Sequence, residues 1–178
     1  MIDFPNGHQA HHGSRPILVG VVPGQPAVVV EQAAVFAERF AADLVCASVD
    51  SSRYTVEQRP DGAAVTMPID PDLGDEQVAA FDPALRDSLA QILEKRDVRW
   101  SVRALAGGVA PELARLAEEL DAAMIVVGTR ESGLRESLRE FLNGSVAVQL
   151  AHRQHRPLVV VPLNPVTTEH ELPWRRKA

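Results

Sequence analysis

Residues 125–148 read IVVGTRESGLRESLREFLNGSVAV, and this stretch decides the fold. Its first residues complete an apolar run that follows Asp121, and such an unbroken run is typical of a strand buried on both faces of a parallel sheet. The run stops at Gly128, where the backbone can turn sharply or approach a ligand closely. Gly144-Ser145 opens an apolar helical pattern and is therefore expected at a helix start, a position that favours anions.

The remaining apolar patterns extend this alternation over most of the chain. Further buried strands are predicted at 17–22, 44–49 and 158–161, with a more exposed strand at 98–102. Helical spacing predicts helices at 29–40, 82–96, 113–120 and 144–155, with Asp82-Pro83 starting the second and Lys95-Arg96 in its last turn. Strands that alternate with helices imply right-handed crossovers and a parallel sheet. The sequence predicts a three-layer α/β fold with a five-stranded parallel sheet.

Residues 51–80 interrupt the alternation and are too long for a connection without structure of its own. Residues 54–56 and 64–67 are strand-like, and the sequence RPDG at 59–62 between them is typical of a turn. A small β-hairpin excursion is therefore predicted. The acidic residues after it lack the spacing of a calcium loop and favour a solvated loop; they are Asp70, Asp72, Asp75 and Glu76.

Length and composition indicate one domain at 15–163, flanked by a flexible arm (1–14) and a tail (164–178). A chain of 178 residues, 46% of them hydrophobic, can bury roughly 70% of its unfolded surface. The arm carries three histidines, and a disordered arm is favoured over a metal site, so no metal is expected. In the tail, residues 174–177 read WRRK, either a solvated end or a docking element.

Charge and hydropathy exclude several classes of partner. The net charge of −6 argues against nucleic acid, which requires a basic face. No apolar run approaches the length of a membrane span, and the start of the chain lacks the apolar core of a signal peptide. The single cysteine, Cys46, excludes an internal disulfide and fits a reducing compartment. We therefore expect a cytoplasmic protein that binds neither nucleic acid nor membrane.

At Gly128, Gly133, Gly144 and Ser145 the sequence resembles the universal stress protein family. Nucleotide-binding members of that family carry the pattern G-x2-G-x9-G-[ST] after the fourth strand. Here four and ten residues separate the three glycines instead of two and nine. The resemblance implies strand order 3-2-1-4-5, with a ligand at the carboxyl ends of strands one and four.

The resemblance also assigns roles to individual residues. The glycines at 128, 133 and 144 would cradle phosphates, and the Ser145 hydroxyl with the N–H groups of Ser145 and Val146 would donate to them. Backbone near Leu44, in the second strand, would meet the adenine. Arg130 and Arg135 could clamp phosphates bidentately, although the alternating glutamates of residues 130–142 favour a solvated charged helix.

The first strand departs from the family pattern. Members usually end this strand in an aspartate that contacts the adenosine, and here Val22 and Pro23 fall in that place. A hydrogen bond to a charged group contributes roughly 1.5–3 kcal/mol, so its loss would weaken nucleotide binding.

Two hypotheses for function stay open at this point. The first is a stress-response regulatory protein that binds ATP, ADP or AMP, with magnesium. The second is a nucleotide-free dimeric module of the same fold that engages a protein partner through the hairpin and the tail. A slow nucleotide hydrolase is less favoured, because no catalytic motif is present. In either case the resemblance implies a homodimer through the strand Leu158–Val161, an apolar edge that must be covered.

Overall fold

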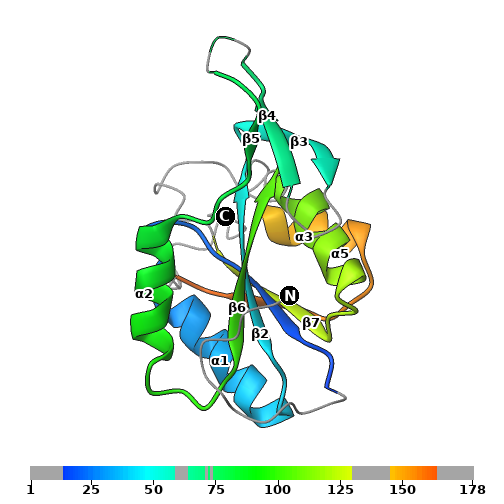
Figure 1. Ribbon diagram of the computed structural model, residues 1–178. Helices are drawn as coiled ribbons and strands as arrows, with labels where there is room; N and C mark the ends of the chain where they lie inside the picture. The colour runs from blue at the N-terminus through cyan, green and yellow to red at the C-terminus, as the bar shows by residue number, and fades with distance from the viewer. Residues whose placement is uncertain (1–13, 59–63, 71, 73, 130–144, 164–178) are drawn as a thin grey trace, which may run out of the picture.

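The computed structural model describes residues 14–58, 64–70, 72, 74–129 and 145–163 (Figure 1). Its centre is a five-stranded parallel sheet in the order β6-β2-β1-β7-β8. In chain order this is 3-2-1-4-5, so the predicted topology is confirmed. The strands are β1 (Ile17–Gly20), β2 (Leu44–Asp50), β6 (Trp100–Ala106), β7 (Met124–Gly128) and β8 (Leu158–Val161).

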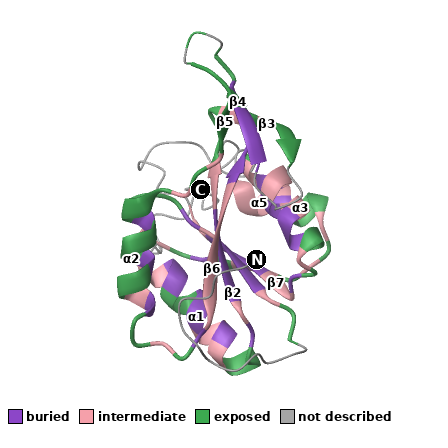
Figure 2. Ribbon diagram, viewed as in Figure 1, coloured by how far each residue is buried: buried purple, intermediate pink, exposed green. Residues whose placement is uncertain are grey.

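Helices cover both faces of this sheet, as predicted. One face carries α1 (Val28–Phe40) and α2 (Pro83–Leu93), and the other carries α3 (Val109–Glu119) and α5 (Val146–Arg153) (Figure 1). Neighbouring strand residues point to opposite faces and join two separate apolar clusters, as Ile17 and Leu18 do. Both residues are fully buried, and Figure 2 shows burial concentrated in the central strands and on the inner faces of the helices.

Helix α2 begins where the sequence predicts and ends earlier. The Asp82 carboxylate accepts hydrogen bonds from the N–H groups of Ala84 (2.8 Å) and Leu85 (3.3 Å), which is the expected N-cap. The prediction that Lys95-Arg96 lie in the last turn is wrong, because α2 ends at Leu93. Arg96 instead forms an ion pair with Glu38 of α1 at 3.4 Å.

The excursion at 51–80 forms a second sheet of three antiparallel strands. Its strands are β3 (Arg53–Gln58), β4 (Ala64–Pro68) and β5 (Gln77–Val78). The predicted pairing of the first two strands is confirmed, while residues 59–62 lie outside the described residues. The third strand is not predicted, because two residues carry no periodic signal.

Two polar residues of β3 hold the second sheet together and against the first. The Arg53 guanidinium donates to the Thr66 hydroxyl (2.9 Å), the Thr66 carbonyl (2.9 Å) and the Asp75 carbonyl (2.9 Å). The Thr55 hydroxyl donates to the Ala106 carbonyl of β6 (3.2 Å). The second sheet therefore stands beyond the carboxyl ends of β2 and β6, at the top of Figure 1.

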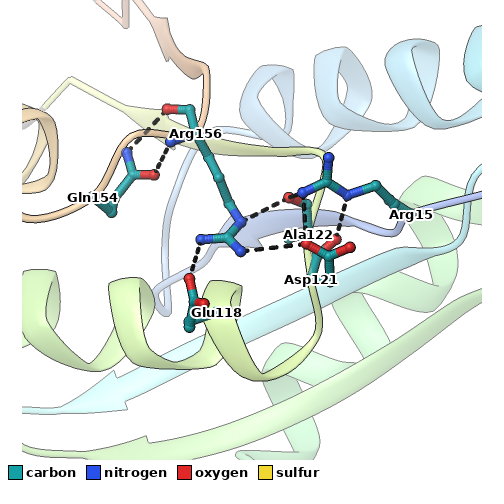
Figure 3. Close-up of polar contacts among 6 residues, drawn as sticks. All are labelled: Arg15, Glu118, Asp121, Ala122, Gln154 and Arg156. Atoms are coloured by element: carbon teal, nitrogen blue, oxygen red, sulfur yellow. Dashed lines mark hydrogen bonds and ion pairs between the residues drawn. The ribbon is translucent and has the colours of Figure 1, made fainter.

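Arg156 closes the opposite, amino edge of the main sheet (Figure 3). Its Nε donates to the Ala122 carbonyl (2.9 Å), and its guanidinium also pairs with Glu118 (2.6 Å) and Asp121 (3.4 Å). These contacts, the Glu118 hydrogen bond first, raise the pKa of Arg156. Arg15 reaches the same place through the Asp121 carbonyl (2.9 Å). The two arginines tie the end of α3 to the starts of β1, β7 and β8.

The structure corrects the expected end of the last helix. Helix α5 stops at Arg153, two residues before the predicted end, and Arg156 follows it in the connection to β8. Only 9% of the Arg156 side chain is exposed, because its guanidinium packs against the end of α3 and pairs with Glu118. His152, Arg153 and His155 are exposed.

Arg156→Ala is therefore expected to lower the free energy of unfolding by about 1–3 kcal/mol, since the buried Ala122 carbonyl loses a charged donor. Arg153→Ala, three residues earlier and exposed, provides the matched control and is expected to stay within about 0.5 kcal/mol of the parent. Urea unfolding at neutral pH measures both. Equal effects of the two substitutions would contradict the assigned role of Arg156.

Candidate functional site

The main sheet opens between β1 and β7 at its carboxyl edge. These neighbouring strands pair only as far as Val19 and Val126. Beyond that point the N–H of Val21 donates to a carbonyl of β2 (2.9 Å), and the N–H of Thr129 donates to a carbonyl of β8 (2.9 Å). The chain then follows β1 into α1 on one face, whereas α5 lies on the other face. Such a switch point is where open α/β sheets bind ligands.

Gly128 is required at this edge by packing. A Cβ at this position would lie 2.9 Å from Val29 Cγ2, 3.1 Å from Gln25 Nε2 and 3.5 Å from Leu163 Cδ1. The first distance is below any normal contact, so the start of α1 packs directly on the glycine backbone. The groups that approach Gly128 in this structure belong to the protein itself, and its expected approach to a ligand stays a prediction.

The turn after β1 brings an amide side chain to the same edge. Pro23 and Gly24 fill the central positions of a tight turn that a Gln25 N–H to Val22 carbonyl bond closes (3.2 Å). Gly24 has φ +73°, as the third position of a type II turn requires. The Gln25 side-chain oxygen accepts a bond from the Val22 N–H (3.2 Å), and its nitrogen faces Gly128. Val22 and Pro23 stand where the family pattern has an acid, and the turn brings the Gln25 amide to the same edge.

Helix α5 presents its amino end toward the carboxyl edge, because it runs antiparallel to the strands that flank it. Ser145 is its N-cap in an extended conformation, and its carbonyl accepts from the Gln149 N–H (3.1 Å). The Ser145 hydroxyl makes no capping bond to the helix. The N–H groups of the first turn, including that of Val146, have no acceptor within the helix. The hydroxyl and these amides are the donors an anion needs.

The structure does not bring every predicted site residue to this edge. Leu44 is the first residue of β2, pairs with Ile17 at the amino end of β1 and is fully buried. The prediction that Leu44 meets the adenine is therefore wrong. β2 has seven residues, each of which adds about 3.3 Å, so its first residue lies at the amino edge and its last at the carboxyl edge. Arg130, Gly133, Arg135 and Gly144 lie outside the described residues.

Asp50 ends β2 at the carboxyl edge, and the sequence analysis did not name it as a candidate site residue. Its carboxylate accepts from the Ser52 N–H (2.9 Å) and the Ser52 hydroxyl (2.6 Å). Its carbonyl accepts from the Gly107 N–H (3.0 Å), in the turn before α3. The signal was available, since an acid directly after a buried strand is expected at the carboxyl edge of the sheet. Gln25 carried no such signal, because its approach to Gly128 depends on the turn.

Groups suited to nucleophilic or metal chemistry are not gathered at this edge. Cys46 lies in the middle of β2, and burial raises the pKa of its thiol to about 12, so the reactive thiolate is suppressed. Within the described ranges, no three histidine, cysteine or carboxylate side chains are close enough to share a metal ion. His152 and His155 lie near the end of α5, at the opposite edge. The geometry supports anion and base recognition through backbone and amide groups.

A family model described as the universal stress protein family matches residues 13–162. The chain belongs to this family. A comparison with curated proteins found no match. Across its described part, the chain has no helix with the length and hydrophobicity needed to cross a bilayer.

Solved structures of universal stress proteins share the fold. One in complex with cAMP superposes with a TM-score of 0.56 at 19% identity, covering 85% of this chain and 100% of the other. A second, from Archaeoglobus fulgidus in complex with dAMP, gives 0.52 at 15% identity, covering 82% and 96%. A third, from Burkholderia pseudomallei, gives 0.50 at 20% identity, covering 84% and 96%. At these identities the likeness establishes the fold of this universal stress protein and nothing finer.

Proposed function

We propose that this universal stress protein is a regulatory protein that binds an adenine nucleotide where β1 and β7 part. The single observation behind this proposal is the convergence of donors at one edge. Ser145 and the first amides of α5 come from one side, and the Gln25 amide comes from the other. The first group suits a phosphate, because helix N-termini carry partial positive charge.

The polar groups on the β1 side suit the base and the ribose of the nucleotide, whereas those of α5 suit its phosphate. An amide both donates and accepts, so Gln25 can satisfy the complementary edge of an adenine. Asp50, at the end of the next strand, can accept from a ribose hydroxyl if its bonds to Ser52 are exchanged. Gly128, Arg130, Gly133 and Gly144 remain proposed phosphate contacts. Two relatives of this fold hold cAMP and dAMP, and both ligands are adenine nucleotides.

Ser145→Asp and Ser145→Asn test this site as a matched pair. Both side chains cap a helix well, so the fold of each variant is retained. The aspartate alone places a negative charge against the proposed phosphate. AMP, or ATP with magnesium, at about 100 times its dissociation constant adds roughly 2.7 kcal/mol of stability, which is about 5–10 °C in melting temperature for a chain of this size. The shift is expected in the parent and in Ser145→Asn, and is expected to disappear in Ser145→Asp.

Two results would count against the proposal. A parent protein that does not shift at millimolar nucleotide favours the nucleotide-free interaction module. A shift that survives in Ser145→Asp places the nucleotide away from α5.

We further propose that the protein forms a homodimer through β8. This strand ends the described order of the main sheet, and Val160 is 41% exposed on it. A bare apolar edge strand invites uncontrolled pairing and must be covered. A second copy of the same strand, related by a twofold axis, covers both edges at once.

Val160→Glu is expected to convert the dimer to monomer, because it would bury two unpaired carboxylates at the twofold interface. Phe40→Glu is the matched control, since Phe40 is an exposed apolar residue (57%) at the end of α1, away from β8. Sedimentation velocity at micromolar concentration distinguishes the two species. A dimer that persists in Val160→Glu would refute this interface.

A further inference from the structure

The second sheet has a face, turned away from the main sheet, on which several large apolar residues are exposed. Strand alternation places Thr55 and Thr66 on the inner side, where Thr55 bonds to Ala106 of the main sheet. The opposite side, here called the outer face, carries five apolar residues, of which Ile69 is 63% exposed and Met67 is 38% exposed. They are Tyr54, Val65, Met67, Ile69 and Val78; four of them are exposed, and Val65, in the middle of β4, is only 5% exposed.

Tyr54, Met67 and Ile69 form a continuous exposed surface, and the buried Val65 lies between it and Val78. Tyr54 lies directly opposite Met67, and its hydroxyl reaches the Met67 sulfur at 3.9 Å. Val65 lies opposite Val78, two residues along β4. The Ile69 N–H donates to the Ser52 carbonyl (2.8 Å) and so continues the ladder by one more residue. Contiguous apolar patches of this kind mark interaction surfaces, unlike apolar residues exposed singly.

Exposed carboxylates are frequent in and next to the second sheet, while Arg115 of α3 donates to Gln58 at the end of β3 (3.3 Å). Five exposed acidic residues belong to the second sheet and the segments next to it: Glu57, Asp70, Asp72, Asp75 and Glu76. Among the described residues from 52 to 80 the only cation is Arg53, whose guanidinium is already engaged by Thr66 and by the carbonyl of Asp75. The surface therefore selects a partner that joins an aromatic or aliphatic anchor to positive charge.

We infer that the outer face is the docking site of the chain's own C-terminal segment, Leu172–Lys177. This segment reads LPWRRK and supplies two apolar anchors followed by three consecutive cations. Trp174 can pack against the Met67 thioether and the Tyr54 ring, since both sulfur–aromatic and aromatic pairs are favourable. Arg175, Arg176 and Lys177 then meet the exposed carboxylates in and next to the second sheet.

The distances allow this docking within one chain. Leu163, where the described chain ends, lies at the carboxyl edge because its N–H bonds to the Thr129 hydroxyl (2.9 Å). Four strand spacings of about 4.8 Å separate β8 from β6, which is roughly 19 Å across the sheet. The eleven residues from Leu163 to Trp174 span up to ~36 Å when extended. The rest of this length can cover the distance from the carboxyl edge of the main sheet to the second sheet.

Other occupants fit the outer face less well. The N-terminal arm, residues 1–13, contains no lysine or arginine and enters the fold at the amino edge, opposite the second sheet. A second copy of the outer face would bring two sets of exposed carboxylates together, and like charges across an interface oppose association. The C-terminal segment is the part of this chain that matches both the charge and the position.

Methyl NMR of the full chain labelled at methionine tests the inference. Met67 reports on the outer face, and Met124, at the amino end of β7, is an internal control. Removal of residues 172–178, or Trp174→Leu, is expected to shift the Met67 resonance and leave Met124 in place, because the indole ring current is lost. Charge reversal of residues 175–177 to glutamate, or about 1 M salt, which shortens the screening length to about 3 Å, is expected to produce the same shift.

The outcomes are decisive in either direction. A Met67 resonance that does not move on truncation overturns the inference. A shift that grows with protein concentration assigns the face to the tail of another copy and overturns docking within one chain.

Tryptophan fluorescence provides a second test. In a Trp100→Phe background, Ile69→Lys is expected to release Trp174 from the outer face, which is measured as a red shift of the tryptophan emission. Phe40→Lys, an equally exposed apolar position on α1, is expected to leave the emission unchanged.

Discussion

The parting of β1 and β7 is the constraint on which the rest of this structure depends. Both strands are buried on both faces, so their backbones must stay paired until the edge of the sheet. Past that edge each strand finds its hydrogen bonds on the other side, β1 with β2 and β7 with β8. Where they part, the side chains of Gln25, Val29 and Leu163 lie against Gly128. Gly128 is confined to glycine because α1 packs on its backbone.

The two edges of the main sheet differ in the polar groups that they carry. At the amino edge, Arg15 and Arg156 fasten the end of α3 to the strand starts with charged hydrogen bonds. At the carboxyl edge, the donors of α5 and the amide of Gln25 are held by rigid elements while remaining near the surface. The amino edge is thus fixed by charged hydrogen bonds, and the proposed recognition groups lie at the other edge. The second sheet, with its exposed carboxylates, extends the carboxyl edge.

The sequence predicts the fold closely because its strong periodic signals coincide with buried elements. The unbroken run before Gly128 and the N-cap at Asp82 both lie where expected. What it cannot show is register and turn geometry. Leu44 was placed at the cleft although it starts its strand, and Gln25 reaches Gly128 only through the turn at Pro23-Gly24. Helix ends are misplaced for a similar reason: α2 and α5 end at Leu93 and Arg153, before their predicted ends, and the contacts that Arg156 makes with another element leave no local pattern in the sequence.

The account rests on the claim that ligand recognition belongs to the carboxyl edge between β1 and β7. Amide NMR of the full chain titrated with AMP tests this most directly, because each backbone N–H reports its own position. The account predicts shifts at Val22, Gln25, Thr129 and Ser145, with the amides of Asp121 and Ala123 at the amino edge unchanged. Shifts confined to the amino edge, or none at millimolar AMP, would contradict it.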